Sequence, residues 1–481
     1  MQGHKNYQEK LFVNFHLSER IPESNFYRRL KSALDLEYLR SLTSRYYGSE
    51  GQKSIDPVVF FKLMLVGYLE NICSDRKIIE QCSLRMDVLY FLGYDIDEPL
   101  PWHSTLSRTR KLFGEEVFLS FFRGILKKCV ENGLVDGRSQ AVDSAFIKAN
   151  ASRDSLVERS SLFDSGIAAG SKKYFDDITA NEEPCARKEK ASEAKKAANF
   201  NERYASKTDP DSRLSRKSGK PYALNHLGII SVDTASHVIC GAAVDLADKG
   251  DSRTMEGIVC QTAESLQGNG IAVEEVAADS SYSSGETYKY LEEQNITAYI
   301  PVRGSYRAQK EGFSYDEEND RYVCEAGSDL TFRGFRQQKG RETLEKIYGS
   351  SAEHCRNCPL KPKCCPNRNS KRMDVPFYRH YYDDAYERMK TFRGRQKKRR
   401  RMATVEPVWG TLLNFMRMKK VYTIGNALAQ KQLLMAAAAY NIKKLMLLKC
   451  VKPAAKAVKN IAAKMKEVFD DKIMVYKVGV V

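Results

Sequence analysis

Apolar residues follow two kinds of pattern along this chain. Between Phe26 and about Leu134 they recur at helical spacing, and residues 58–69 are apolar nearly all round, which predicts a buried helix. Asp56 and Pro57 supply the cap and first turn of that helix. Residues 140–150 instead hold a nearly continuous apolar run, which predicts a strand that is covered on both faces.

The helical stretch carries a short basic segment. Asp75 is predicted to cap a helix over 76–86, and Ser104 to cap a helix over 105–113 that contains Arg108, Arg110 and Lys111. A helix, a turn and a short basic helix are typical of a DNA-reading helix-turn-helix. A small helical bundle with no DNA role has the same pattern, so both interpretations stay open.

After residue 140 the pattern alternates between strands and helices. Two β runs at 226–232 and 238–244 predict a hairpin with Asp233 in its turn, and Asp251 is predicted to cap a helix over 252–266. A strand over 272–279, a helix over 286–294 and a strand over 296–302 then predict a parallel crossover. Ligands bind at the carboxyl ends of such strands, where Asp279 lies.

Two segments interrupt this α/β pattern. Residues 152–220 form a polar insertion that is predicted to be helical over Glu189–Phe200. Residues 304–392 form an excursion with a hairpin at Phe313–Cys324 and a cysteine cluster. A core helix then carries Glu406, and Pro407 predicts that this helix begins or kinks nearby. A last helix over 425–447 closes the fold.

Charge and cysteine content narrow the class of protein. The formal net charge of +17 is concentrated in basic runs, which favours a polyanionic partner such as nucleic acid over an acidic or neutral one. The chain shows no apolar run long enough to span a bilayer and no secretory signal, so we expect a soluble protein in the cytoplasm with reduced thiols.

The cysteines bunch within residues 355–365. Cys355 and Cys358 have the C-x-x-C spacing of a zinc knuckle, and Cys364 and Cys365 could add ligands. A second C-x-x-C is missing, so a structural zinc site and a reduced cysteine-rich turn are both open interpretations.

Three acidic residues stand in distinctive surroundings. Asp143 interrupts the buried apolar run, Asp279 ends a later strand, and Glu406 lies at the edge of a helical apolar stripe. A buried carboxylate is costly unless a cation or several donors receive it. The order of elements around these acids, a hairpin and a crossover followed by an insertion and a helix, is that of an RNase H-like fold.

With these motifs the chain resembles the DDE transposases of bacterial insertion sequences. The resemblance runs over nearly the whole chain, and its segments are Val142–Ala151, Ala278–Ser283, the C-x-x-C-P turn, Thr404–Gly410, Ala437–Leu445 and the helical stretch Pro57–Phe113. It implies that Asp143, Asp279 and Glu406 hold two Mg²⁺ ions, for which Mn²⁺ can substitute, and that they cleave and join DNA. The partners would be the terminal inverted repeats and target DNA, bound by a homodimer.

The expected fold is an α/β RNase H-like core with an all-α N-terminal domain and an inserted β and cysteine-rich excursion. The expected boundaries are 1–135 for the helical DNA-binding domain, 136–303 and 393–450 for the core, 304–392 for the excursion and 451–481 for a basic tail. Candidate DNA contacts are Arg108, Arg110, Lys111, Lys397, Lys398, Arg399, Arg400, Arg401 and Arg417.

Arg417 is included because many relatives carry a basic residue soon after the catalytic Glu, where this chain has Leu413 and Asn414. Lys419 and Lys420 are the alternatives at that place. Two other functions compete with transposition: an RNase H-like nuclease that cleaves without strand transfer, and an inactive DNA-binding protein derived from a transposon. The three acidic motifs argue against the inactive form.

Overall fold

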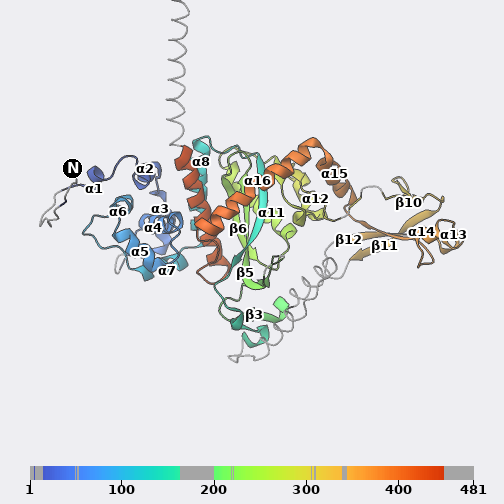
Figure 1. Cartoon of the computed structure of the whole chain (residues 1–481), viewed down its shortest axis with the longest axis horizontal. Coiled ribbons are helices and arrows are strands. Elements are labelled where there is room, and N and C mark those ends of the chain that lie inside the picture. Colours follow the sequence, from blue (N-terminus) through green and yellow to red (C-terminus); the bar gives the residue numbers. More distant parts are fainter. Residues whose placement is uncertain are drawn as a thin grey trace, which may run out of the picture. The chain divides into compact units, whose positions relative to one another are not determined.

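The computed structural model describes residues 5, 15–48, 50, 54–162, 200–217, 219, 221–304, 306–307, 310–337 and 344–448 (Figure 1). The chain divides into two compact units. Unit 1 comprises Met1–Leu134, Asn414–Met418 and Leu434–Val481, and unit 2 comprises Val135–Leu413 and Lys419–Leu433. Across the described residues, no helix combines the length and the apolar composition that crossing a membrane requires.

Up to Leu134, the described elements of unit 1 are all helical. They are α1 (Leu17–Arg20), α2 (Phe26–Ala33), α3 (Tyr38–Thr43), the 3₁₀ turn η1 (Ser44–Tyr46), α4 (Pro57–Leu69), α5 (Asp75–Ser83), α6 (Met86–Leu92), α7 (His103–Leu112) and α8 (Glu115–Glu131). The apolar run predicted to be a buried helix is α4, and the Asp56 carboxylate accepts the Val58 N–H at 2.8 Å as the predicted cap. Phe60 and Phe61 of α4 pack against the ring of Phe113 in the core of the unit.

Two predicted helix caps in unit 1 are wrong. Ser74 is the residue before α5, and the carboxylate of Asp75 pairs with the Arg110 guanidinium instead of capping. Trp102 precedes α7, and Ser104 lies within its first turn. In the first case a long-range charge partner outcompetes the local backbone N–H groups for the carboxylate.

A six-stranded sheet forms the centre of unit 2. Its strands are β1 (Ser139–Lys148), β4 (Arg213–Ser215), β5 (Ala223–Asp233), β6 (Ile239–Leu246), β7 (Glu275–Ala277) and β8 (Thr297–Tyr299). β6, β5, β1, β7 and β8 lie side by side in that order, with β4 paired to the start of β5. β1 runs antiparallel to β5 and parallel to β7, and β7 runs parallel to β8. The hairpin β5–β6 was predicted, and Asp233 accepts hydrogen bonds from Ser236 in its turn.

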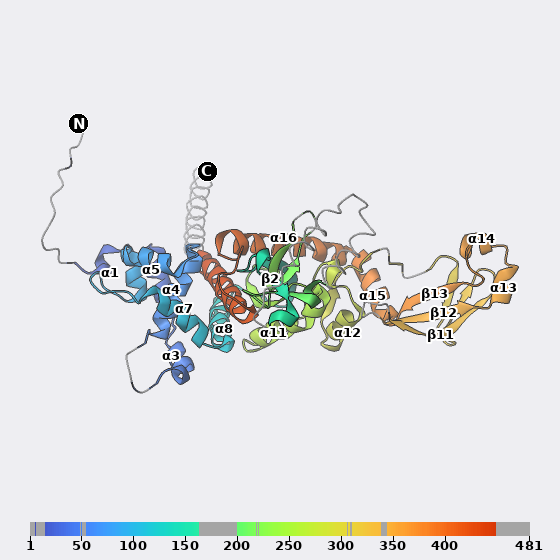
Figure 2. The ribbon, with the colours of Figure 1, turned by 90° about the horizontal axis from the view of Figure 1, so that it is seen from below.

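Helices cover both faces of this sheet (Figure 2). On one face, α11 (Met255–Gln267) and α12 (Gly285–Glu293) bury Ile258 and Leu291 against Val142 of β1. On the other face lies α16 (Phe392–Phe415). Gly228 of β5 makes this contact close, because a Cβ there would come within 2.9 Å of the Trp409 ring of α16.

Two predictions around these helices need correction. Asp251 opens the 3₁₀ turn η4 (Asp251–Thr254), and its carboxylate accepts the Ser144 hydroxyl, so it does not cap α11. Ser284 caps α12 by accepting the Thr287 N–H, so this helix begins one residue before the predicted start. Pro407 lies inside α16, which begins fifteen residues earlier at Phe392 rather than near the proline.

The segment between β8 and α16 builds a second sheet. Five antiparallel strands stand in the order β13–β12–β11–β10–β9, with bounds β9 (Phe313–Asp316), β10 (Arg321–Cys324), β11 (Asp329–Gln337), β12 (Leu344–Ser350) and β13 (Arg372–Pro376). The predicted hairpin is β9–β10. α13 (Ala352–Arg356) and α14 (Lys361–Cys364) lie between β12 and β13, and α15 (Arg379–Lys390) leads to α16.

The polar insertion after β1 is described only in part. The 3₁₀ turns η2 (Arg153–Ser155) and η3 (Arg159–Leu162) flank β2 (Leu156–Glu158), which pairs with β3 (Tyr204–Ser206). The helix expected over Glu189–Phe200 lies outside the described residues except for its last residue, and so does the basic tail. After α16, residues 426–448 form a further helix, as the pattern over 425–447 predicts.

Candidate active site

Asp143 lies on β1, and Asp279 lies two residues beyond the end of the neighbouring strand β7. β1 and β7 are parallel, with Ala141 opposite Ala277, so the chain reaches both acids two residues further on. Val142 and Ala278 point into the core with α11 and α12. Because side chains alternate along a strand, the acids next to them face the other side of the sheet, where α16 lies.

Arg401 of α16 joins the two carboxylates. Its Nη2 lies 2.6 Å from Asp143 Oδ1 and 3.7 Å from Asp279 Oδ2. The side chain of Asp279 also accepts the Ser281 N–H at 2.8 Å and so caps the 3₁₀ turn η5 (Ser280–Tyr282). Two acids from different strands therefore share one internal cation.

The surroundings of Asp143 favour its neutral form. Burial and, to a smaller extent, the nearby charge of Asp279 raise the pKa of Asp143 to about 6, against the opposing attraction of Arg401. A carboxyl group whose pKa is shifted by burial and by a second carboxylate is typical of a functional site. Additional positive charge at this place would stabilise both ionised groups.

Glu406 stands a little more than one turn beyond Arg401 on α16, with an exposed side chain. Asp143, Asp279 and Glu406 therefore come from β1, the end of β7 and α16. Among the described residues, no three His, Cys, Asp or Glu side chains converge as a group that could hold a metal ion. Carboxylate oxygens are nevertheless the type of ligand that Mg²⁺ prefers. Asp143 and Asp279 also already bind one positively charged group, the guanidinium of Arg401.

The predicted basic run on α16 divides into two groups. Lys397 binds Glu275 of β7 together with Arg393, and Arg401 binds Asp143. Lys398, Arg399 and Arg400 are exposed, although Arg400 also donates to the Thr234 carbonyl at 3.1 Å. The exposed group remains accessible to a phosphate backbone.

The other predicted DNA contacts also divide by burial. Arg108 and Lys111 of α7 are exposed. Arg110 is buried and makes two hydrogen bonds to Asp75, at 2.7 and 3.1 Å. Arg417 is buried as well, donates to the Cys73 carbonyl at 3.0 Å and lies over the Tyr68 ring. The guanidinium groups of Arg110 and Arg417 thus bind partners in the interior of unit 1, so they are not among the DNA contacts proposed below.

The buried pair leads to a first prediction. Arg110→Ala should lower the free energy of unfolding of unit 1 by about 3 kcal/mol, because it leaves the Asp75 carboxylate without its charged partner. Arg108→Ala, two residues away and exposed, should stay within about 0.5 kcal/mol of the parent. Urea unfolding followed by circular dichroism measures both. Equal stability of the two variants would contradict a structural role for Arg110.

The predicted cysteines gather on the second sheet. Cys355, Cys358, Cys364 and Cys365 line one pocket, and Cys324 at the end of β10 lines it too. Sequence reasoning missed Cys324 because it lies far from the cluster along the chain. The signal was present in the predicted hairpin, whose second strand ends at that residue. Sequence reasoning also missed that Arg401 pairs with the acids rather than lying free for DNA.

Comparison with known proteins gives two family matches. Residues 15–112, which hold α1 to α7, match the family described as Transposase domain (DUF772). Residues 323–446, which hold the cysteine cluster and Glu406, match the family described as Transposase DDE domain. No curated protein matches the chain.

Among the solved structures that are similar is the cryo-EM structure of the piggyBac transposase synaptic complex with hairpin DNA. It is 10% identical, with 88% of this chain and 73% of that chain covered and a TM-score of 0.30, a likeness too weak to argue from. The two family matches cover both the helical segment and the helix that carries Glu406. By these matches, the chain belongs to the DDE-type transposases.

Proposed function

We propose that this protein binds the terminal inverted repeats of a bacterial insertion sequence and catalyses cleavage and strand transfer of its DNA ends. The observation that carries the proposal is that Arg401, on the helix that bears Glu406, joins Asp143 of β1 to Asp279, which follows the parallel strand β7. The strand order β6–β5–β1–β7–β8, with its antiparallel and parallel halves, supports assignment to the RNase H-like fold.

In this proposal Asp143, Asp279 and Glu406 are the metal ligands and Mg²⁺ is the cofactor, as two ions that Mn²⁺ can replace. Bound there, the ions would supply an activated water and stabilise the leaving oxygen of the phosphodiester. Asp143 has to be ionised to serve, and its pKa of about 6 keeps it mostly so at neutral pH. Arg401 has to release Asp143 and would then lie where the scissile phosphate arrives.

The exposed cations supply the DNA contacts. Lys398 and Arg399, with Arg400, would hold the phosphate backbone at the cleaved end, while Arg108 and Lys111 of α7 would read the repeat. We expect a homodimer in the DNA complex and a site of action in the bacterial cytoplasm, on the nucleoid. The thiols of Cys355–Cys365 take no part in the cleavage, because thiolates suit zinc rather than magnesium.

The decisive experiment uses the repeats in the genomic DNA on either side of the gene. Purified protein is incubated with a duplex that ends in one repeat and with a supercoiled target plasmid, in Mg²⁺ or in EDTA. Strand transfer predicts repeat ends joined covalently to the target, only with Mg²⁺ and only when the 3′ end carries a hydroxyl. Cut ends without joined products would instead identify a nuclease, and no cleavage at all would contradict the proposal.

The two kinds of DNA contact should have different salt signatures. Lys398→Ala/Arg399→Ala should lower the slope of log affinity against log salt by about one unit per lost phosphate contact, on repeat and scrambled duplexes alike. Arg108→Ala should cost roughly 1–3 kcal/mol on the repeat and little on the scrambled duplex. Fluorescence anisotropy across a salt series measures both variants. Equal losses on both duplexes for Arg108→Ala would remove the reading role from α7.

A further inference from the structure

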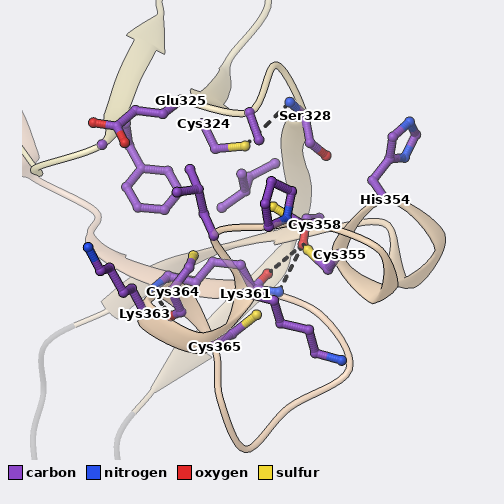
Figure 3. A pocket seen from close by; sticks show the side chains of 18 of the residues that line it. Cys324, Glu325, Ser328, His354, Cys355, Cys358, Lys361, Lys363, Cys364 and Cys365 are labelled. Atoms are coloured by element: carbon purple, nitrogen blue, oxygen red, sulfur yellow. Dashed lines mark hydrogen bonds between the residues drawn. The ribbon is translucent and has the colours of Figure 1, made fainter.

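One pocket on the second sheet gathers five cysteines from distant parts of the chain. Cys324 comes from β10, Cys355 and Cys358 from α13 and the turn after it, and Cys364 and Cys365 from the end of α14 (Figure 3). The cavity has a volume of about 490 Å³. None of these five thiols is used in a disulfide.

Cys324 sits in a turn that is shaped around its sulfur. The Ser328 N–H donates to the Cys324 Sγ at 3.3 Å, and the Cys324 N–H donates to the Ser328 carbonyl at 3.0 Å. Gly327 permits this tight turn, with a φ of 73°. A backbone N–H directed at the sulfur holds this side chain in place, as contacts behind a metal ligand do.

The facing segment supplies the remaining thiols and positive charge. The Ser350 Oγ lies 3.0 Å from the Cys355 Sγ, which fixes the first cysteine of the C-x-x-C pair to the end of β12. Lys361, Lys363 and Lys371 line the same pocket, and the Lys371 Nζ donates to the Cys364 carbonyl at 2.9 Å. Lysines around a set of thiolates offset their mutual repulsion.

We propose that Cys324, Cys355, Cys358 and one thiol of the Cys364–Cys365 pair form a structural Zn²⁺ site. Four thiolates are a closed tetrahedral ligand set for zinc, and Cys324 supplies the partner that the single C-x-x-C lacks. A closed tetrahedral site takes four ligands, so only one of Cys364 and Cys365 is expected to ligate. His354 also lines the pocket, but its ring points away from the labelled sulfurs (Figure 3).

Binding of the ion would draw the hairpin and the α13–α14 segment together. Within the described part of the chain no three of these side chains stand as a metal-holding group, so the ligands have to close around the ion. Metal binding of this kind is coupled to local folding. The ion would thus tie the end of the β9–β10 hairpin to the loop between β12 and β13, without contributing to the Asp143–Asp279 site. This inference does not depend on the proposed function.

The test uses the full chain with Zn²⁺ or Co²⁺ chloride. The purified protein should hold one zinc per chain, and replacement by Co²⁺ should give the visible absorption and sulfur-to-metal charge-transfer bands of a tetrahedral thiolate site. Cys324→Ser should weaken Zn²⁺ binding beyond the roughly 10–100-fold loss typical of outer-shell changes. The matched control is Cys260→Ser, an exposed cysteine on α11, which should bind zinc like the parent.

Three further variants identify the fourth ligand. Cys364→Ser/Cys365→Ser should lose zinc as Cys324→Ser does, and of the two single variants only one should. Retained emission from the buried Trp409 shows that the sheet of β1 remains folded in each variant. Zinc binding by Cys324→Ser equal to that of Cys260→Ser would overturn the proposal, and so would a parent protein that takes up neither metal.

Discussion

Asp143→Asn should reduce DNA-end cleavage by about a thousand-fold or more, the scale of losing a central charged group of a catalytic site. The substitution keeps the size of the side chain and removes the charge that Arg401 now neutralises and that a metal ion would need. Asp279→Asn and Glu406→Gln should have effects of the same order, because all three carboxylates are proposed to hold the same ions. Single-turnover cleavage of a labelled repeat end in Mg²⁺ measures the loss.

Two controls separate chemistry from folding and binding. Asp251 provides a matched variant, because its carboxylate accepts the hydroxyl of Ser144, the residue next to Asp143 on β1. Asp251→Asn should cleave at close to the parent rate, and both variants should bind the repeat as tightly as the parent. Calorimetry with Mn²⁺ should show that Asp143→Asn loses metal binding. Equal activity of Asp143→Asn and the parent would exclude the proposed site.

The order of strands and helices in unit 2 follows from local pattern. β1 is a continuous apolar run, which predicts a buried strand. β5 and β6 are two apolar runs joined by a turn, which predicts a hairpin. The positions of Asp143 and Asp279 depend only on this order, since parallel strands carry their ends to the same edge. The proximity of Asp143 and Asp279 could therefore be predicted from the sequence.

Ion-pair partners that are distant along the chain could not be predicted in this way. Asp75 was expected to cap a helix, but Arg110 takes its carboxylate across thirty-five residues. Arg401 was expected to hold DNA and instead bridges two acids that lie far before it in sequence. In each case the charged group pairs with a partner that only the folded chain brings near. The sequence alone does not show whether a basic residue is buried against such a partner or exposed to solvent.

The largest effect on stability in unit 2 should come from a buried polar cluster that no motif marked. Asp209 and His226 are both fully buried, with His226 Nε2 3.1 Å from Asp209 Oδ2 and His226 Nδ1 2.5 Å from the Asn426 side-chain oxygen. Asp209 also accepts the Gly425 N–H at 3.2 Å. The cluster therefore ties the insertion after β1 to β5 and to the start of the last helix.

The protonation of Asp209 sets how this cluster responds to pH. Burial raises the pKa of Asp209, but the hydrogen bond and charge of His226 and the backbone N–H of Gly425 outweigh it, so the pKa lies below its ordinary value. The folded state thus favours the ionised acid. Its contribution to stability is present above the unfolded-state pKa of about 4 and is lost as the pH falls through the lower folded-state value.

Asp209→Ala should accordingly lower the free energy of unfolding of unit 2 by about 4 kcal/mol, because it leaves the buried His226 ring and the Gly425 N–H without their acceptor. Asp211→Ala is the control: this exposed acid accepts the Asn426 N–H, and its loss should cost only about 1 kcal/mol.

The chain has two tryptophans, Trp102, largely exposed, and the buried Trp409. In a Trp102→Phe background, urea unfolding followed by Trp409 emission reports on unit 2, and the loss for Asp209→Ala should shrink below about pH 4. A loss no larger than that of Asp211→Ala at neutral pH would show that the cluster does not hold the insertion in place.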